Sequence, residues 1–143
     1  MRRYLVVAHR TLGGSHLFEH LHHLREEDPN CRFHLLVPEQ HPHDHAWSDG
    51  EIHHAAEVRL KEVLELMAEM GMGATGEVGD PSPVYAIGTV LRREGESAFA
   101  GIVLSTLPKG RSFWLRNNVP QRVAKAFPTI PLTHLVADDV LVG

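Results

Sequence analysis

The sequence predicts a five-stranded, doubly wound α/β sandwich, with a parallel sheet between two layers of helices. Short apolar runs alternate with amphipathic stretches along the chain, which is typical of parallel strands joined by crossover helices. The chain has 143 residues, of which 43% are hydrophobic and 22% charged, and this suits one packed domain over residues 1–143. Gly, Pro, Asp and Asn separate the segments and mark the turns.

The first half of the chain predicts two strands and two helices. Residues 4–8 and 33–37 are apolar runs of strand length, and between them leucines at 17, 21 and 24 repeat at helical spacing. Asp28, Pro29 and Asn30 end that helix, because a residue before proline is biased out of the helical region. The polar segment 38–50 is predicted to be a loop, and a second amphipathic helix follows over residues 51–70.

The second half continues the alternation. Glycines at 71 and 73 end the second helix, so the pattern Gly-x-Gly-x-x-Gly at 71–76 is interpreted as a helix stop and not as a phosphate-binding turn. Asp80-Pro81 or Ser82-Pro83 can begin the third helix, which extends to about Arg93. The remaining predicted segments are strands over 74–78, 100–104 and 130–136, a loop over 105–112 and a helix over 118–127.

A ligand of such a sheet binds outside the carboxyl ends of the strands, where the strand order reverses. The segments that follow the first four strands should therefore surround any site. The loop after the fourth strand carries hydroxyls, a glycine and two cations, which suits an anion. The residues predicted to contact a ligand are Ala8, His9, Arg10, Val37, Gly79, Asp80, Ser105, Thr106, Lys109, Gly110, Arg111 and Ser112.

The chain has 12 histidines, and two groups of them suggest a metal site. His16, His20 and His23 stand one turn apart along the first predicted helix, and imidazoles at positions i and i+4 can share a Zn²⁺ ion. A second group, at 41, 43 and 45, alternates in the polar loop. A histidine-based metal binder is one hypothesis, and its alternative is that these side chains are solvated.

Nucleophilic catalysis is not expected. Cys31, the single cysteine, lies in a turn at the amino end of a strand and is interpreted as an inert structural thiol. Ser105 and Thr106 lie at the expected site, with His9 ending the neighbouring first strand. However, the chain lacks a Gly-x-Ser-x-Gly elbow, and no acid can be assigned to orient His9.

Charge and hydropathy limit the partners. The formal net charge is −4, from 14 basic and 18 acidic side chains that are interspersed, and this disfavours nucleic acid and anionic lipid. No apolar run approaches the roughly 20 residues of a membrane span. The first residues are basic but no cleavage site follows them, so we expect a mature cytoplasmic protein without a membrane anchor.

Five segments carry a shared pattern: the first strand Tyr4-Leu5-Val6-Val7-Ala8, the turn Gly79-Asp80-Pro81, the run Gly101-Ile102-Val103-Leu104-Ser105-Thr106, residues 112–120 and the last strand over 131–136. Together they resemble the universal stress protein family, and the resemblance spans nearly the whole chain. It implies a flavodoxin-like, adenine nucleotide alpha hydrolase-like sandwich of three layers.

Many members of that family bind ATP through the motif G-x2-G-x9-G-[ST] after the fourth strand, because glycines let backbone amides approach the phosphates. Here the four positions hold Ser105, Pro108, Asn118 and Val119, so no glycine of the motif is present. His9 stands where the family has an acidic residue facing the nucleotide, and Pro108 removes a backbone donor. The resemblance therefore implies a branch that does not bind ATP, or a different anion held by Lys109, Arg111 and Ser112.

The resemblance also implies a homodimer formed through the last strand, which would otherwise leave a sheet edge. We therefore expect a universal-stress-protein-like cytoplasmic dimer that binds a small ligand or a partner in a stress response and performs no chemistry of its own. The alternative is an ATP- or AMP-binding switch, or a slow ATPase, in which Thr106, Lys109 and Ser112 replace the lost glycines.

Overall fold

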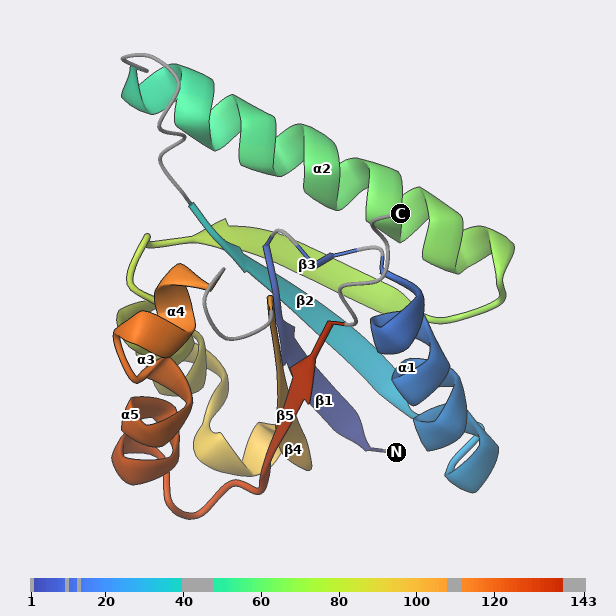
Figure 1. The fold of residues 1–143 in the computed structure, drawn as a ribbon. Helices are drawn as coiled ribbons and strands as arrows, with labels where there is room; N and C mark the ends of the chain where they lie inside the picture. Colours follow the sequence, from blue (N-terminus) through green and yellow to red (C-terminus); the bar gives the residue numbers. More distant parts are fainter. Residues whose placement is uncertain (1, 10, 13, 40–47, 108–111, 138–143) are drawn as a thin grey trace.

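The computed structural model describes residues 2–9, 11–12, 14–39, 48–107 and 112–137. Within them, five parallel strands form one sheet in the order β3-β2-β1-β4-β5 (Figure 1). The strands are β1 (Arg3–Val7), β2 (Arg32–Pro38), β3 (Ala74–Gly79), β4 (Gly101–Thr106) and β5 (Leu132–Val136). The helices are α1 (Ser15–Glu27), α2 (Asp49–Glu69), α3 (Pro83–Glu94), the 3-10 turn η1 (Glu96–Ala98), α4 (Phe113–Arg116) and α5 (Val119–Ala126). The predicted α/β fold is confirmed, as a flavodoxin-like three-layer sandwich.

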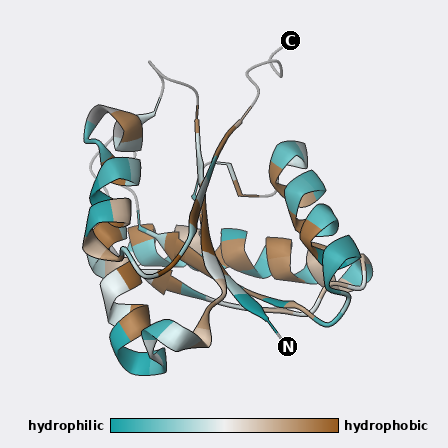
Figure 2. Cartoon of the chain, turned by 90° about the horizontal axis from the view of Figure 1, so that it is seen from below, coloured by the Kyte–Doolittle hydropathy of each residue, from teal (hydrophilic) through white to brown (hydrophobic). Residues whose placement is uncertain are grey.

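Helices cover both faces of the sheet (Figure 1). On one face, α1 and α2 pack against the strands in a core that includes Leu17, Leu60 and Phe33. On the other face, α3 and α5 contribute Ile87 and Val123 to a second core. Hydrophobic residues concentrate between the layers and hydrophilic residues face outward (Figure 2). Burial on both faces explains why the central strands are continuously apolar and do not alternate with polar residues.

The second helix begins two residues earlier than predicted. Ser48 forms a capping box, because its Oγ accepts from the backbone N–H of Glu51 at 3.1 Å and the Glu51 carboxylate accepts from the backbone N–H of Ser48 at 3.2 Å. Asp49 and Gly50 therefore belong to α2, and the prediction of a loop through residue 50 was wrong there. The predicted stop is confirmed, since Gly71 has a φ of 77° and the backbone N–H of Met72 donates to Met67 at 2.9 Å.

Two further boundaries differ from the prediction. β4 continues through Ser105 and Thr106, which were expected in a loop, because β5 pairs with β4 as far as Thr106. α4 was not predicted, since four residues are too few to show an apolar period. At the third helix the structure selects Ser82 as the N-cap, with its Oγ accepting from the N–H of Tyr85 at 3.4 Å. None of the described helices has the length and apolar composition that crossing a membrane requires.

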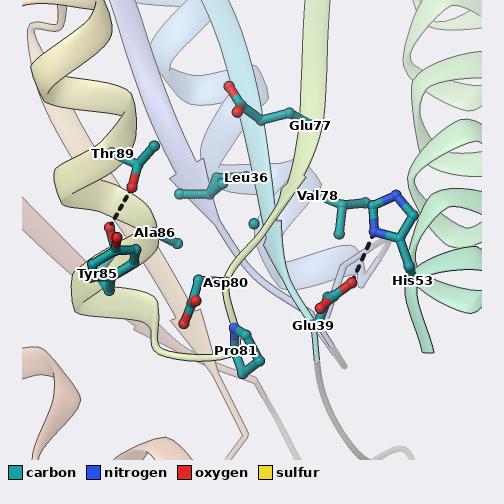
Figure 3. Close-up of a pocket in the computed structure, with 11 residues that line it drawn as sticks. Leu36, Glu39, His53, Glu77, Val78, Asp80, Pro81, Tyr85, Ala86 and Thr89 are labelled. Carbon is teal, nitrogen blue, oxygen red and sulfur yellow. Dashed lines mark hydrogen bonds and ion pairs between the residues drawn. The ribbon is translucent and has the colours of Figure 1, made fainter. Parts of the chain in front are cut away.

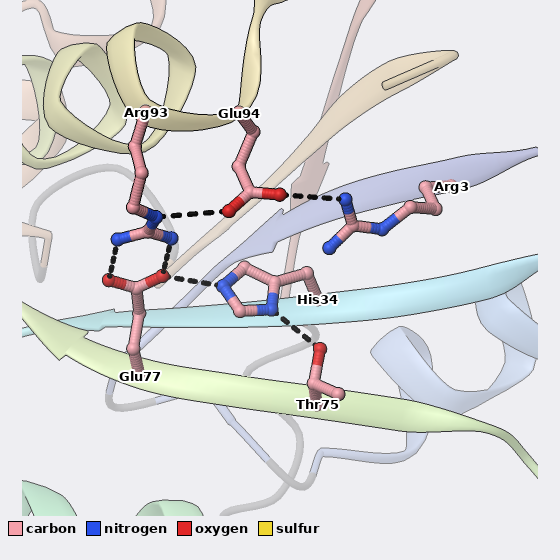
Figure 4. A network of polar contacts seen from close by, with 6 residues as sticks. All are labelled: Arg3, His34, Thr75, Glu77, Arg93 and Glu94. Carbon is pink, nitrogen blue, oxygen red and sulfur yellow. Dashed lines mark hydrogen bonds and ion pairs between the residues drawn. The ribbon is translucent and has the colours of Figure 1, made fainter. Parts of the chain in front are cut away.

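A polar network ties three strands to α3 (Figure 4). His34 on β2 is 8% exposed and uses both ring nitrogens, with Nδ1 2.6 Å from Thr75 Oγ1 and Nε2 2.6 Å from Glu77 Oε2. Arg93 forms a bidentate pair with Glu77. The chain of contacts continues from Arg93 to Glu94 at 3.0 Å and from Glu94 to Arg3 at 3.2 Å. The network therefore provides hydrogen-bond partners for a buried histidine inside the otherwise apolar interior of β2.

The Glu77 carboxylate should make stability fall in acid. The Arg93 guanidinium, followed by the His34 imidazole, holds the pKa of Glu77 below its ordinary value of 4.5. Its contribution is complete above that value and is lost as the pH falls through the lower folded pKa. We expect Glu77→Gln to lower the free energy of unfolding by about 1 kcal/mol at neutral pH and by less at about pH 3, measured by urea titration. Glu62→Gln, at an exposed position of α2, is the control; an equal loss at both pH values would contradict the assignment.

Candidate functional site

The strand order reverses between β1 and β4, so the switch point of the sheet lies at their carboxyl ends (Figure 1). Val7 pairs with Leu104, and the residues that follow them leave neighbouring strands side by side. His9 therefore follows the strand that pairs with β4. In open α/β sheets, ligands bind in the crevice at this point. The candidate site is therefore the crevice between the carboxyl ends of β1 and β4.

Three side chains from separate segments meet at this switch point. Ser105 at the end of β4 is 1% exposed, and its Oγ lies 2.6 Å from Thr11 Oγ1 and 2.9 Å from His16 Nε2. Thr11 follows β1 and is 6% exposed, while His16 is the second residue of α1. We call Thr11, His16 and Ser105 the switch-point cluster. Its hydrogen bonds fix the loop after β1 and the start of α1 against the end of β4.

A second hydroxyl–imidazole pair lies on the other side of β4. Thr106 is 2% exposed, and its Oγ1 lies 2.9 Å from Nε2 of His134 on β5. Successive strand residues point to opposite faces, so Ser105 and Thr106 direct their hydroxyls to different helix layers. Burial lowers the pKa of His134, which favours the neutral imidazole. The end of β4 is thus held by a hydroxyl–imidazole contact on each face.

Most buried polar side chains of the described residues gather at this end of the sheet. The structure buries five of them: Thr11, His34, Ser105, Thr106 and Ser112. All except His34 follow β1, end β4 or follow β4. Ser112 Oγ accepts from the backbone N–H of Leu115 at 3.1 Å and so starts α4. Among the described residues, buried polar side chains are therefore concentrated at the switch point.

The contact between Ser105 and His16 has the distance of a nucleophile–base pair, but its surroundings differ from those of a catalytic serine. A reacting carbon must reach the serine oxygen, and Ser105 is almost completely buried. Its Oγ is also engaged by Thr11 and His16 together. The geometry favours a structural hydroxyl that positions the walls of the crevice.

A separate pocket of about 440 Å³ opens beside the carboxyl ends of β2 and β3 (Figure 3). We call it the edge pocket. Leu36, Val78 and Ala86 provide apolar surface, and carboxylates from three segments make the rim acidic. Its lining residues are Leu36, Glu39, His53, Glu77, Val78, Gly79, Asp80, Pro81, Tyr85, Ala86 and Thr89. Gly79 and Asp80, predicted to belong to one site with Ser105, line this pocket instead.

Two partners hold the histidine of the edge pocket. His53 Nδ1 lies 2.8 Å from Glu39 Oε2 (Figure 3), and His53 Nε2 lies 3.3 Å from Glu57 Oε2. The hydrogen bond with Glu39, and then the charge of Glu57, raise the pKa of His53. Asp80 is used locally, since its Oδ1 accepts from the backbone N–H of Ser82 at 2.9 Å.

The other predicted ligand residues divide into three groups. Ala8 and Val37 have no exposed surface and belong to the core under α1 and α2. His9 contributes its carbonyl oxygen, which accepts from Nε of Arg59 at 3.0 Å. The predicted residues Arg10, Lys109, Gly110 and Arg111 lie outside the described residues, as do the loop histidines His41, His43 and His45.

The three histidines of α1 are directed to different partners. His16 contacts Ser105, whereas His23 Nε2 lies 2.8 Å from Glu27 Oε1 on the exposed side of the helix. Burial lowers the pKa of His20. Across the ranges that the structure describes, no group of three or more His, Cys, Asp or Glu side chains is placed to hold a metal ion. The structure does not bring the predicted trio together.

Sequence reasoning missed several contributors. Thr11 lies in the segment after β1 that was expected to border the site, but an isolated threonine carries no chemical signal. His134 was placed only in a strand, and its contact depends on the pairing of β5 beside β4. Glu39 and His53 come from opposite ends of a segment that was predicted to be a loop followed by a helix.

No family model matches the chain, and no curated protein matches it.

The two partnered histidines should titrate on opposite sides of the ordinary histidine pKa of 6.5. We expect the midpoint of His53 to lie above this value, because Glu39 and Glu57 favour the imidazolium, and that of His134 to lie below it, because burial disfavours the charge. NMR titration of the ring resonances measures both midpoints. Glu39→Gln should lower the midpoint of His53 and leave that of His134 unchanged; coincident midpoints in the unmodified protein would contradict the assignment.

Proposed function

We propose that this protein is a universal-stress-protein-like module that binds a small anionic ligand in the crevice between β1 and β4, without chemically converting it. The observation that carries the proposal is the concentration of buried hydroxyls at the ends of these two strands. A buried hydroxyl costs free energy unless it is hydrogen bonded, and apolar residues would serve packing alone. The cluster of Thr11, His16 and Ser105 instead gives the crevice preorganised polar walls.

Charge favours an anion in this crevice. α1 begins here without an acidic residue in its first turn, so the positive end of its dipole is not neutralised by its own first turn. Arg59 reaches the carbonyl oxygen of His9 at the edge of the crevice. In the sequence, Arg10 follows β1, and Lys109 and Arg111 follow β4. The sequence therefore has three basic residues shortly after the two strands that border the proposed site.

A compact anion fits better than an extended triphosphate. Glu39 and Asp80 line the neighbouring edge pocket, and their carboxylates would repel a second phosphate group extending toward β3. The alternative ATP- or AMP-binding switch needs the hydroxyls of Thr106 and Ser112. Both are already engaged, Thr106 with His134 and Ser112 with the first turn of α4. A stress-response role and a cytoplasmic location belong to this proposal through the family resemblance alone.

The proposed module is a homodimer that pairs through β5. β5 is an edge strand, and Val136 at its end is 47% exposed. An apolar residue on an open strand edge favours pairing with another strand. Sedimentation equilibrium tests this part: Val136→Lys should shift a dimer toward the monomer, whereas Val58→Lys, at an equally exposed position of α2, should not.

Ligand binding can be tested by thermal shift with a panel of compact anions, including carboxylates and phosphate monoesters, with ATP and AMP alongside. We expect at least one compact anion to raise the melting temperature, because a ligand that binds only the folded state stabilises it. Lys109→Ala combined with Arg111→Ala should remove the shift. His16→Ala should weaken it, because the wall of the crevice then loses its contact with Ser105.

His23→Ala is the matched control, since it removes an imidazole from the exposed side of the same helix. Binding that is unchanged in the Lys109/Arg111 and His16 variants would place the ligand elsewhere. Equilibrium dialysis that shows saturable micromolar binding of labelled ATP would contradict the compact-anion proposal. Release of phosphate from ATP at a rate proportional to protein concentration would contradict the absence of chemistry.

A further inference from the structure

A second pocket lies at the opposite end of the sheet, at the amino ends of β2 and β3. The turn between α1 and β2 and the turn between α2 and β3 enclose about 320 Å³ there. Its lining comprises Arg25 in the last turn of α1, residues 29–32, and the backbone of Gly71 and Gly73. We call it the amino-edge pocket. It shares no lining residue with the edge pocket or with the switch-point cluster.

The guanidinium of Arg32 lies against the backbone of Gly73. A β-carbon at position 73 would collide with Nη1 of Arg32 and crowd its Cδ and Cζ atoms. The absence of a side chain at this position therefore makes room for the arginine. Because Gly73 also lines the pocket, the guanidinium of Arg32 lies at the pocket wall, although Arg32 as a residue is exposed.

Neither arginine of this pocket is neutralised. In the part of the chain that the structure describes, no carboxylate lies within ion-pair distance of the guanidinium of Arg25 or Arg32, and neither guanidinium donates a hydrogen bond to another residue. Arg3 and Arg93, by contrast, are both paired with glutamates. Two unneutralised guanidinium groups in one pocket repel each other, and an anion between them would remove that repulsion.

The remaining lining residues supply no negative charge that would balance the two arginines. Burial, and then the nearby Asp28 carboxylate, raise the pKa of the Cys31 thiol, so this side chain stays neutral. The carboxylate of Asp28 accepts from the backbone N–H of Asn30 at 3.1 Å and is used within the turn. Asn30 contributes an amide side chain to the lining residues. The pocket thus combines two cations and an amide with no acid among its lining residues.

We propose that the amino-edge pocket binds a small oxyanion of the phosphate class, through the guanidinium groups of Arg25 and Arg32. A guanidinium presents parallel N–H donors that match two oxygens of a phosphate, which a point charge does not. The small volume suits inorganic phosphate or the terminal group of a phosphate monoester. This inference does not depend on the crevice between β1 and β4, because the two places lie at opposite ends of the strands.

The carboxyl-terminal ends of α1 and α2 are the alternative partners of Arg25 and Arg32. α1 and α2 both finish at this edge, and the negative end of a helix dipole attracts cations. α2 has no basic residue in its last turn, so Arg32 from β2 would be available to compensate for its dipole. A purely structural role predicts that loss of Arg32 changes stability but not phosphate binding, and the experiment separates the two.

Isothermal titration calorimetry with inorganic phosphate, and separately with glycerol 3-phosphate, tests the proposal in the full chain. We expect saturable binding that falls roughly tenfold or more in Arg32→Gln and is lost when Arg25→Gln is added, because the bidentate contacts are removed. If the Arg32→Gln variant does not fold, Arg32→Lys replaces it in the experiment. Arg32→Lys keeps the positive charge but lacks the guanidinium fork, so it too should bind phosphate more weakly than the unmodified protein. Arg122→Gln, on the exposed side of α5, is the charge-matched control and should bind like the unmodified protein.

Absence of saturable phosphate binding to the unmodified protein would overturn the inference, and so would equal affinity in the unmodified protein and the Arg25/Arg32 variant. Loss of binding in Lys109→Ala with Arg111→Ala, but not in the Arg25/Arg32 variant, would also overturn it and would assign the anion to the crevice. Conversely, phosphate binding that depends only on Arg25 and Arg32 supports this site even if the crevice binds nothing.

Discussion

The parallel sheet is buried on both faces, and this constraint decides at which edge of the sheet the strands and helices of this protein begin and end. Each strand must return through a crossover helix, so the carboxyl ends of all five strands lie at one edge and their amino ends at the other. The reversal of strand order between β1 and β4 then leaves a crevice at the carboxyl edge that no crossover covers. Helix starts collect at that edge and helix ends at the opposite one, which gives the two edges different electrostatic character.

Polar groups are distributed according to this division. The interiors of β1, β2 and β4 are apolar, apart from His34, whose two ring nitrogens are both engaged. At the carboxyl edge the backbone leaves the sheet, and hydroxyls there find partners from neighbouring loops, as Ser105 does with Thr11. At the amino edge, Arg25 lies in the last turn of α1 and Arg32 is the first residue of β2. Among the described residues, buried polar side chains other than His34 are thus concentrated where β1 and β4 end.

The two proposed anion sites differ in their chemistry. At the carboxyl edge, the described groups are hydroxyls and imidazoles that are hydrogen bonded to one another. At the amino edge, Arg25 and Arg32 face a pocket without a compensating acid. A compact ligand suits the first because the neighbouring edge pocket carries Glu39 and Asp80. A phosphate suits the second because two guanidinium groups match its shape and charge.

Local chemistry in the sequence determined the strands, the long helices and the stop of α2 at Gly71, because hydrophobic period, proline and glycine act within a few residues. It also predicted that Ser105 and His9 lie at the same edge of the sheet, since parallel strands end at one edge. Tertiary structure alone decided the contact of Ser105 with Thr11, across 94 positions of sequence, and the pocket between Arg25 and Gly73. These depend on strand order and on how closely two turns pack, and neither leaves a periodic signal in the chain.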